Sequence, residues 1–257
     1  MVAAGASVIG LIPARAGSRR VQHKNIRRLG AHPLIAYTIA AARASGILDA
    51  VLVSTDSERI AGIARHYGAE VPFLRPAAMA TETSPDIEWL RYTLERLRER
   101  GREYQAFCIL RPTSPFRKPQ TIRRAWRQFL DDPGADSLRA IEKCAQHPGK
   151  MWVVRANRMT PFVKEQPDGT PWHSRPYQAL PPVYAQNASL EIAWTRVVSE
   201  HGTISGLVLA PFISEGDEGF DINVQEEWWI AERMLETGAG TLPEVEQVPY
   251  PESGPGK

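Results

Sequence analysis

The sequence predicts an α/β fold in which a mainly parallel sheet carries helices on both faces. Short apolar segments rich in β-branched residues, such as residues 7–12 and 50–54, alternate with longer segments whose apolar side chains recur every three or four positions. Strands that alternate with helices form parallel sheets, because each helix returns the chain to the starting edge of the sheet. The 257 residues are enough for one such domain and a smaller lobe.

The individual elements follow from the length and composition of these segments. The apolar runs predict strands at residues 7–12, 50–54, 71–74, 107–110 and 137–141. The segments between them predict helices at residues 34–44, 58–67, 85–100 and 119–130. A later strand is expected at residues 207–211 and a last helix at residues 224–235.

An inserted lobe is expected where this alternation stops. Prolines, polar residues and aromatic side chains dominate HPGKMW, TPFVKEQPDGTPWHSRPYQALPPVY and NASLEIAW. We therefore expect a core built from residues 7–142 and 203–237, a small inserted lobe of extended segments at residues 143–202, and a tail at residues 238–257.

Charge and composition exclude several classes of protein. Lys and Arg total 31 against 29 Asp and Glu, so the net charge of +2 lacks the basic excess of a nonspecific nucleic-acid binder. The two cysteines, Cys108 and Cys144, lack a metal-ligand spacing, which indicates reduced packing residues. No apolar run reaches membrane length and the first residues lack a cleavable leader pattern, so we expect a cytoplasmic protein without a membrane partner.

The loop after the first expected strand, within IGLIPARAGSRRVQHKNI, gathers positive charge where an α/β sheet binds ligands. Pro13 ends the strand, Gly17 permits unusual backbone angles, and small residues such as Ala14 let backbone N–H groups approach an anion. Arg15 and Lys24 can add charge-assisted hydrogen bonds to phosphate oxygens. The loop has neither the GxxxxGK[ST] nor the GxGxxG pattern, and a solvated surface loop is the alternative.

This loop resembles the signature loop of the acylneuraminate cytidylyltransferases, a family that activates acidic nine-carbon and eight-carbon sugars. HPLIAYTIAAA, VLVSTDSERIAGIARHYGAEVPFLRP, LRPTSPFR, HPGKM and FDIN follow in the family's order and approximate spacing. The resemblance implies a Rossmann-like nucleotidyltransferase sheet and CTP as substrate. It also implies that an acceptor oxygen attacks the α-phosphorus and pyrophosphate leaves, so that positioning and electrostatic stabilisation dominate catalysis.

The resemblance also places the family's nucleotide-binding residues on this chain. The triphosphate positions are Arg15, Ser18, Lys24 and Asn25, with Ala14 beside them in the same loop. Arg15 and Lys24 are the catalytic candidates for stabilising the transferring and departing phosphates. Arg75, in RPAAMATETSP, matches the segment that contacts cytosine; the alternative is that this segment only begins a helix capped by Thr83 or Ser84.

The acceptor side of the family's site falls on Arg111, His147, Lys150 and Arg175. Many sialic-acid enzymes have Gln where this chain has Arg111, and a desolvated guanidinium requires an anion. That anion is either a protein carboxylate, such as Glu82 or Glu191, or a charged group of the acceptor. The second possibility favours a phosphonate or a sugar phosphate as the alternative acceptor, because the guanidinium fork matches such groups.

Magnesium is expected at FDIN, where Asp221 and Asn223 lie on one side of an extended segment. The family's pattern is DID, whose two acidic positions hold magnesium, and Asp221 is therefore also a catalytic candidate. Asn223 keeps a carbonyl oxygen but lacks the second charge. The alternative for Asn223 is a helix N-cap, with Glu226 completing a capping box.

A homodimer is expected, because Trp152, Trp172 and Tyr177 supply more aromatic area than a small lobe can bury. The resemblance implies that this lobe reaches the site of the neighbouring subunit. Two other functions compete with a cytidylyltransferase. A non-catalytic nucleotide-binding protein would keep the basic loop without turnover, and a glycosyltransferase would share the acidic motif but would not need this loop.

Overall fold

The computed structural model describes residues 5–164 and 169–251, which divide into two compact units. One unit, which we call the core unit, contains the described residues up to 140 and those from 187 onward. The other, which we call the small unit, contains the described residues within 141–186. Of the expected tail, residues 252–257 lie outside the described part of the chain.

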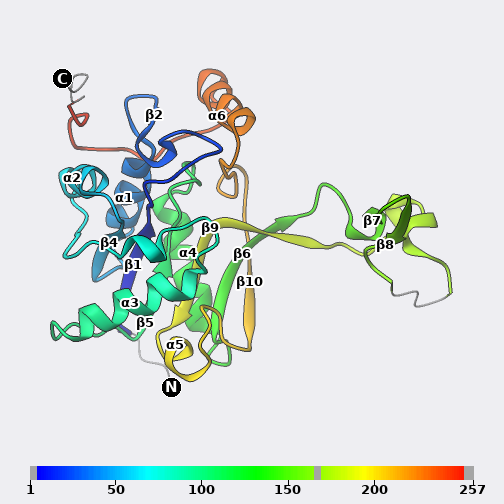
Figure 1. The fold of residues 1–257 in the computed structure, drawn as a ribbon, viewed down its shortest axis with the longest axis horizontal. Coiled ribbons are helices and arrows are strands. Elements are labelled where there is room, and N and C mark those ends of the chain that lie inside the picture. Colours follow the sequence, from blue (N-terminus) through cyan, green and yellow to red (C-terminus); the bar gives the residue numbers. More distant parts are fainter. Residues whose placement is uncertain (1–4, 165–168, 252–257) are drawn as a thin grey trace. The chain divides into compact units, whose positions relative to one another are not determined.

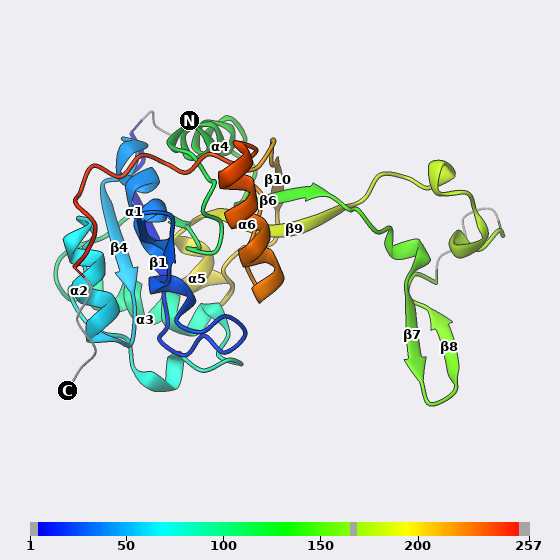
Figure 2. The same ribbon diagram turned by 90° about the horizontal axis from the view of Figure 1, so that it is seen from above.

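A six-stranded sheet forms the centre of the core unit, in the order β10-β6-β9-β5-β1-β4 (Figures 1 and 2). Its strands are β1 (Val8–Pro13), β4 (Ala50–Ser54), β5 (Ala106–Ile109), β6 (Ser137–Lys143), β9 (Tyr184–Trp194) and β10 (Leu209–Ile213). β1 is parallel to β4 and β5, whereas β9 is antiparallel to β5. The expected α/β class with a mainly parallel sheet is confirmed.

Helices cover both faces of this sheet. They are α1 (Leu34–Ala44), α2 (Glu58–His66), α3 (Asp86–Arg98), α4 (Pro119–Asp131), α5 (Arg196–Glu200) and α6 (Gln225–Thr237). Alternate side chains of β1 serve the two faces: Val8 and Ile12 pack with α1, α2 and α4, whereas Ile9 and Leu11 pack with α3 and α5. α6 contributes Trp228 to a third cluster, which includes residues of α1.

Strong local signals place several helix ends correctly. α1 spans its expected residues 34–44. α2 begins after Ser57, whose Oγ accepts the N–H of Ile60 (3.3 Å) as an N-cap. α4 begins with Pro119, where the missing N–H would have no helical partner in any case. α6 is followed by Gly238 at a φ of 72°, a left-handed conformation that glycine adopts without strain.

The strand expected at residues 71–74 is wrong. The chain pairs with β4 only as far as Glu70, whose N–H donates to the Val51 carbonyl (2.8 Å). The Glu70 carbonyl accepts the N–H of Val53 (2.9 Å). Pro72 has no N–H with which to extend this ladder, so the chain leaves the sheet as a loop.

The interpretation of NASLEIAW as part of the inserted lobe is also wrong. Residues 187–194 belong to the core unit and run beside β5 in the central sheet. Leu190 and Ile192 are fully buried, as expected of a central strand. Ser189 and Glu191 alternate with them and are buried as well, and such polar residues conceal a central strand in the sequence.

Asp136 explains why β10 begins two residues later than expected. Its carboxylate accepts the N–H groups of Leu207 (2.8 Å) and Val208 (3.0 Å), which precede the strand. It also pairs with Arg196 (2.7 Å). The two backbone N–H groups, and after them the Arg196 guanidinium, lower the pKa of Asp136. Gly206 permits this close approach, since its φ is 67° and a Cβ there would lie 2.5 Å from the Cβ of Asp136.

Besides the last residues of β6 and the first of β9, the described part of the small unit contains a hairpin and three short 3-10 helices. The hairpin strands are β7 (Trp152–Arg155) and β8 (Arg158–Pro161), and the 3-10 helices are η3 (Pro148–Lys150), η4 (Trp172–Ser174) and η5 (Tyr177–Ala179). Both hairpin strands are exposed apart from the half-buried Pro161. A two-stranded hairpin is marginally stable by itself, so further contacts are expected to support it.

Two expectations from composition can be compared with the described residues. Cys108 and Cys144 are both free, and burial raises the pKa of the Cys108 thiol to about 12, which suits a packing residue. Across residues 5–164 and 169–251, none of the helices combines the length and the apolar character needed to cross a bilayer.

Candidate active site

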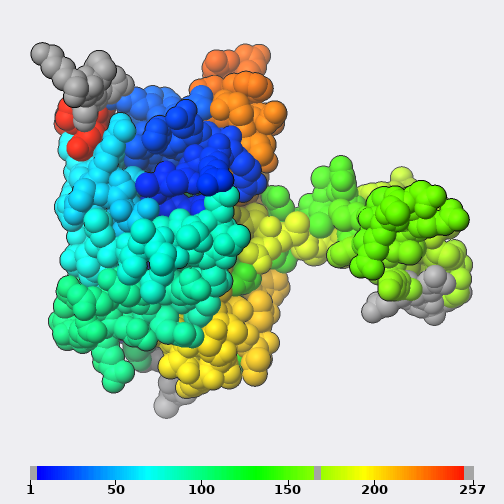
Figure 3. All heavy atoms as spheres, viewed as in Figure 1, coloured from blue at the N-terminus to red at the C-terminus, as the bar shows by residue number. Residues whose placement is uncertain are grey.

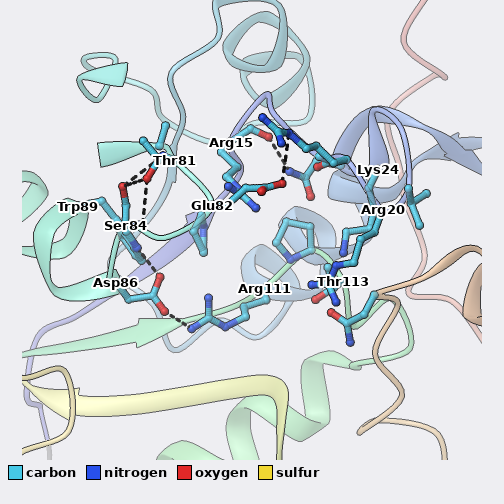
Figure 4. A pocket seen from close by; sticks show the side chains of 18 of the residues that line it. Arg15, Arg20, Lys24, Thr81, Glu82, Ser84, Asp86, Trp89, Arg111 and Thr113 are labelled. Atoms are coloured by element: carbon cyan, nitrogen blue, oxygen red, sulfur yellow. Dashed lines mark hydrogen bonds and ion pairs between the residues drawn. The ribbon is translucent and has the colours of Figure 1, made fainter. Parts of the chain in front are cut away.

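A cavity of about 270 Å³ lies in the core unit at the carboxyl ends of β1 and β5 (Figure 4). Its charged lining residues are Arg15, Arg19, Arg20, Lys24, Arg75, Glu82, Asp86 and Arg111. Six cations against two carboxylates favour an anionic ligand. In Figure 3 the dark blue surface of the loop after β1 adjoins the cyan surface of the segment before α3. Arg19 and Glu82 join these two segments as an ion pair at 3.5 Å.

The loop after β1 contributes side chains to this cavity. The expected nucleotide-binding residues Arg15, Ser18, Lys24 and Asn25 all line it. The backbone N–H groups of Ala14, Ala16 and Ser18, which we expected to face an anion, donate to groups of the protein instead. Ala14 donates its N–H to the Ser54 carbonyl (2.9 Å) and is not among the lining residues. The N–H groups of Ala16 and Ser18 donate to Asp56 Oδ1 (2.9 Å) and to the Ala16 carbonyl (3.0 Å).

Lys24 connects this loop with the segment that precedes α6. It begins the short helix η1 (Lys24–Ile26), and its Nζ donates to the Ile222 carbonyl (2.6 Å). The Ile222 N–H in turn donates to the Thr113 carbonyl (2.8 Å), and the Ile222 side chain is fully buried. Burial lowers the pKa of Lys24, and the Asp221 carboxylate partly opposes this shift. Lys24 therefore lies between the cavity and the expected metal segment.

Arg75 places a buried guanidinium in the wall of the cavity. The residue is 6% exposed, and among the described residues its Nε has no hydrogen-bond partner. Its backbone N–H donates to the Thr55 carbonyl (2.9 Å), which fixes it beside the end of β4. Burial lowers the pKa of Arg75, while the carboxylates of Asp56 and Asp86 raise it. A buried donor without a partner is costly, so a ligand that accepts from Arg75 would be stabilised.

Arg111 is paired with carboxylates of the protein. Its Nη2 donates to Asp86 Oδ2 (2.6 Å), as Figure 4 shows, and to Glu191 Oε1 (2.9 Å). The other oxygen of Glu191 lies 3.0 Å from Arg139 Nη2, so negative and positive groups alternate. Burial lowers the pKa of Arg111, but the two carboxylates outweigh burial and the pKa lies above its ordinary value. Of the two expected protein partners, Glu191 is confirmed, whereas Glu82 pairs elsewhere.

Asp86 is a site residue that the sequence analysis does not identify. Besides Arg111, it accepts the indole N–H of Trp89 (2.7 Å). Burial raises the pKa of Asp86, but Arg111 outweighs burial and the pKa is lowered. The cap expected for α3 at residue 83 or 84 is wrong, because the Ser84 hydroxyl bonds to that of Thr81 (2.6 Å). An acidic residue in a first helical turn is common, so the sequence holds no further signal.

Asp221 and Asn223 lie next to each other before α6. Asn223 lines the cavity and donates its Nδ2 to Asp221 Oδ2 (2.6 Å). The alternative in which Asn223 and Glu226 cap the helix is wrong: Val224 is the N-cap residue, and Glu227 accepts the N–H groups of Asn223 (2.5 Å) and Val224 (3.0 Å). Asp221 Oδ1 is buried without a hydrogen-bond partner among the described residues.

Asp221 and Asn223 fit only a magnesium site that is completed by water and substrate, not one enclosed by protein side chains. No group of three or more His, Cys, Asp or Glu side chains in the described residues could enclose a metal. Mg²⁺ commonly takes one or two carboxylates and completes its coordination with water and substrate phosphates. The unpartnered Oδ1 of Asp221 suits such a site, because the neighbouring Asn223 lines the cationic cavity.

The remaining expected acceptor residues belong to the small unit. His147 is buried there, and Lys150 Nζ donates to the carbonyls of His173 (2.9 Å) and Arg175 (2.5 Å). The Arg175 guanidinium donates to the Thr170 carbonyl (3.3 Å). Lys150 and Arg175 therefore both bind backbone of their own unit.

Comparison with known proteins identifies the family. The family model described as "Cytidylyltransferase" matches residues 9–154, which include the loop after β1, Arg75 and Arg111. The chain is 33% identical over 242 residues to the CMP-N,N'-diacetyllegionaminic acid synthase of Legionella pneumophila, covering 91% of this chain and 99% of that protein. The chain belongs to the cytidylyltransferase family.

Other relatives agree with this assignment. The pseudaminic acid cytidylyltransferase of Campylobacter jejuni is 34% identical over 132 residues, which is 51% of this chain and 57% of that protein. Among solved structures, a CMP:2-keto-3-deoxy-manno-octonic acid synthetase complexed with CTP has a TM-score of 0.65 over 90% of this chain and 99% of that chain. That structure is 12% identical in sequence, so it supports the fold of this cytidylyltransferase and nothing further.

The pairing of Arg111 generates a prediction about stability. Arg111→Gln leaves Asp86 and Glu191 without their cation, so we expect the free energy of unfolding to fall by about 2 kcal/mol, less than for a fully buried pair because a quarter of the side chain is exposed. Arg96→Gln is the control, since it breaks the more exposed Arg96–Glu99 pair (2.5 Å). Denaturant unfolding measures both, and equal losses in the two variants would contradict the structural role of Arg111.

Proposed function

We propose that this cytidylyltransferase transfers CMP from CTP to a sialic-acid-like sugar acid and releases pyrophosphate. The observation that carries the proposal is the cavity at the carboxyl ends of β1 and β5, where six cations face two carboxylates. CTP and a sugar acid are both anionic, so this charge balance suits them. The names of the relatives in Legionella pneumophila and Campylobacter jejuni support an acidic sugar as acceptor.

The proposed reaction is one substitution at phosphorus. An acceptor hydroxyl oxygen forms a bond to the α-phosphorus, the bond from that phosphorus to the bridging oxygen breaks, pyrophosphate takes the electron pair, and the hydroxyl proton passes to water. Arg15 and Lys24 stabilise the charge on the phosphates, with Ser18 and Asn25 beside them. Arg75 donates to a hydrogen-bond acceptor of the cytosine ring, which gives its buried, unpartnered Nε a partner.

The acceptor is proposed to be neutral where it meets Arg111. A guanidinium without an anionic protein partner at this position would favour a phosphonate or sugar phosphate acceptor. Arg111 instead has Asp86 and Glu191 within hydrogen-bonding distance, so no further anion is needed. We assign the sugar carboxylate to His147, Lys150 and Arg175, on the family resemblance alone.

A loss of turnover in Lys24→Ala tests the proposed function. Pyrophosphate release from CTP, measured with N-acetylneuraminate and related sugar acids, should be acceptor-dependent in the parent and fall about 100- to 1,000-fold in the variant, as for a lost oxyanion-hole donor. Lys118→Ala is the control, because Lys118 binds Asp217 (3.4 Å) in the loop before Asp221 and does not line the cavity. No acceptor-dependent release by the parent would reject the proposed function.

We further propose that Asp221 and Asn223 hold Mg²⁺, which would supply positive charge beside the phosphates when bound. Asp221→Asn should shift activity to much higher magnesium, and Asn223→Asp should shift it to lower magnesium, because a hard cation prefers carboxylate oxygen. Glu215→Gln is the control, an exposed acidic residue of the same loop. A magnesium titration of pyrophosphate release measures all three, and identical curves for the parent and Asp221→Asn would count against this site.

We propose that the small unit mediates a homodimer. Within it Trp152 and Tyr177 are 38% and 45% exposed, whereas Trp172 is only partly exposed, and Val154 and Phe162 are 69% and 61% exposed. Such apolar area marks an interface. Light scattering at micromolar concentration should give twice the chain mass, and replacing Val154 and Phe162 with Asp should give a monomer. Val248→Asp, at a 72% exposed site in the core unit, should remain dimeric.

The proposed compartment is the cytoplasm. Cys108 and Cys144 are free thiols, which is usual where glutathione and thioredoxin keep cysteines reduced. No observation favours a non-catalytic nucleotide-binding protein or a nucleic-acid partner over the enzyme.

A further inference from the structure

Asp56 lies where two parts of the candidate nucleotide site meet. It follows β4 by two residues, at the same edge of the sheet as the loop after β1, and β1 and β4 run side by side in Figure 2. The register places Pro13 opposite Ser54, so the segments that follow these residues leave the sheet together. The cavity itself is lined by Arg15 and Arg75 but not by Asp56.

The first partner of Asp56 is the backbone of the loop after β1. Its Oδ1 accepts the N–H of Ala16 (2.9 Å), directly after Arg15. A carboxylate that accepts a backbone N–H makes a charge-assisted bond, which is stronger than one between neutral groups. Two residues earlier the loop is held by the Ser54 carbonyl, which accepts the N–H of Ala14 (2.9 Å). The loop that presents Arg15 is therefore attached to the end of β4 at two points.

Arg75 lies beside Asp56, because its backbone N–H donates to the carbonyl of Thr55, the residue directly before Asp56 (2.9 Å). The residue is buried in the wall of the cavity, and the charged form of a buried guanidinium needs a nearby carboxylate. Asp56 is the stronger of the two carboxylates that raise the pKa of Arg75 against burial, and Asp86 is the other. Since Asp86 also serves Arg111 and Trp89, Asp56 is the carboxylate with fewer competing partners.

We propose that Asp56 is a positioning residue of the nucleotide site, which holds the phosphate-binding loop at Ala16 and stabilises the charged guanidinium of Arg75 for the base. This inference rests on the proposed function, because it assigns these two groups to CTP. Asp56 touches no substrate in it and acts only through its two partners. Loss of the Asp56 carboxylate therefore weakens CTP binding. Through Arg75 it also weakens discrimination between cytosine, whose N3 accepts a hydrogen bond, and uracil, whose N3 donates one.

The chain contains a matched control. Asp49 precedes β4 at the opposite edge of the sheet and accepts the N–H of Val8, the first residue of β1, through Oδ2 (2.6 Å). Asp49→Asn and Asp56→Asn thus remove the same charge from equivalent bonds between the same two strands. They differ in their distance from the cavity, because only Asp56 lies at its edge of the sheet.

Calorimetric titration with CTP and with UTP, in the presence of magnesium, tests the inference without an acceptor. We expect Asp56→Asn to weaken CTP binding about tenfold, the size of one hydrogen bond to a charged group, and to narrow the ratio of CTP to UTP affinity. Asp49→Asn should leave both affinities within about twofold of the parent. Thermal unfolding should show similar losses of stability for the two variants.

A double-mutant cycle with Arg75→Gln isolates the second partner. If Asp56 acts on the base through Arg75, adding Asp56→Asn to Arg75→Gln should leave the CTP-to-UTP ratio unchanged, whereas independent effects would overturn that part of the inference. Asp56→Asn binding CTP as tightly as Asp49→Asn would overturn the whole inference, with the proposed function intact. A parent protein that does not bind CTP would overturn both.

Discussion

Parallel pairing of β1 with β4 and β5 is the constraint on which the candidate site depends. Because parallel strands end at a common edge, the loop after β1, the segment after β4 and the turn after β5 all leave the sheet beside one cavity. The alternation of β1 side chains then commits both faces of the sheet to helices, leaving this edge for polar groups. The position of the cavity is therefore determined by the order and direction of the strands and not by any single residue.

Buried guanidinium groups are the second feature of this edge, and each is stabilised differently. Arg111 has two carboxylates and Arg75 has the charges of Asp56 and Asp86. Arg117 is 1% exposed and donates to the Ser189 and Arg111 carbonyls and to the hydroxyl of Thr38. Burial lowers the pKa of Arg117 to about 10. Unlike Arg117, Arg75 lines the cavity, where a ligand can accept from its unpartnered Nε.

Local signals in the sequence predicted most helices and the loop after β1, but not every contact of that loop. Pro119, Ser57 and Gly238 mark helix ends through backbone chemistry that acts within a few residues. The charges of Arg15 and Lys24 likewise predicted the cationic cavity. The backbone N–H groups of Ala14 and Ala16 were misjudged, because their acceptors are Ser54 at the end of β4 and Asp56 just after it.

The sequence by itself determined the α/β class, the family and the basic loop, since periodicity, turn residues and motif order are properties of neighbouring positions. The tertiary structure alone decided that residues 187–194 form a central strand and that Arg111 meets Asp86 and Glu191. The partners in these contacts lie 25 and 80 positions from Arg111. The residues next to a charged side chain do not indicate which distant group will neutralise it. A buried strand with polar residues likewise has the sequence pattern of a loop, and only its pairing in the sheet identifies it.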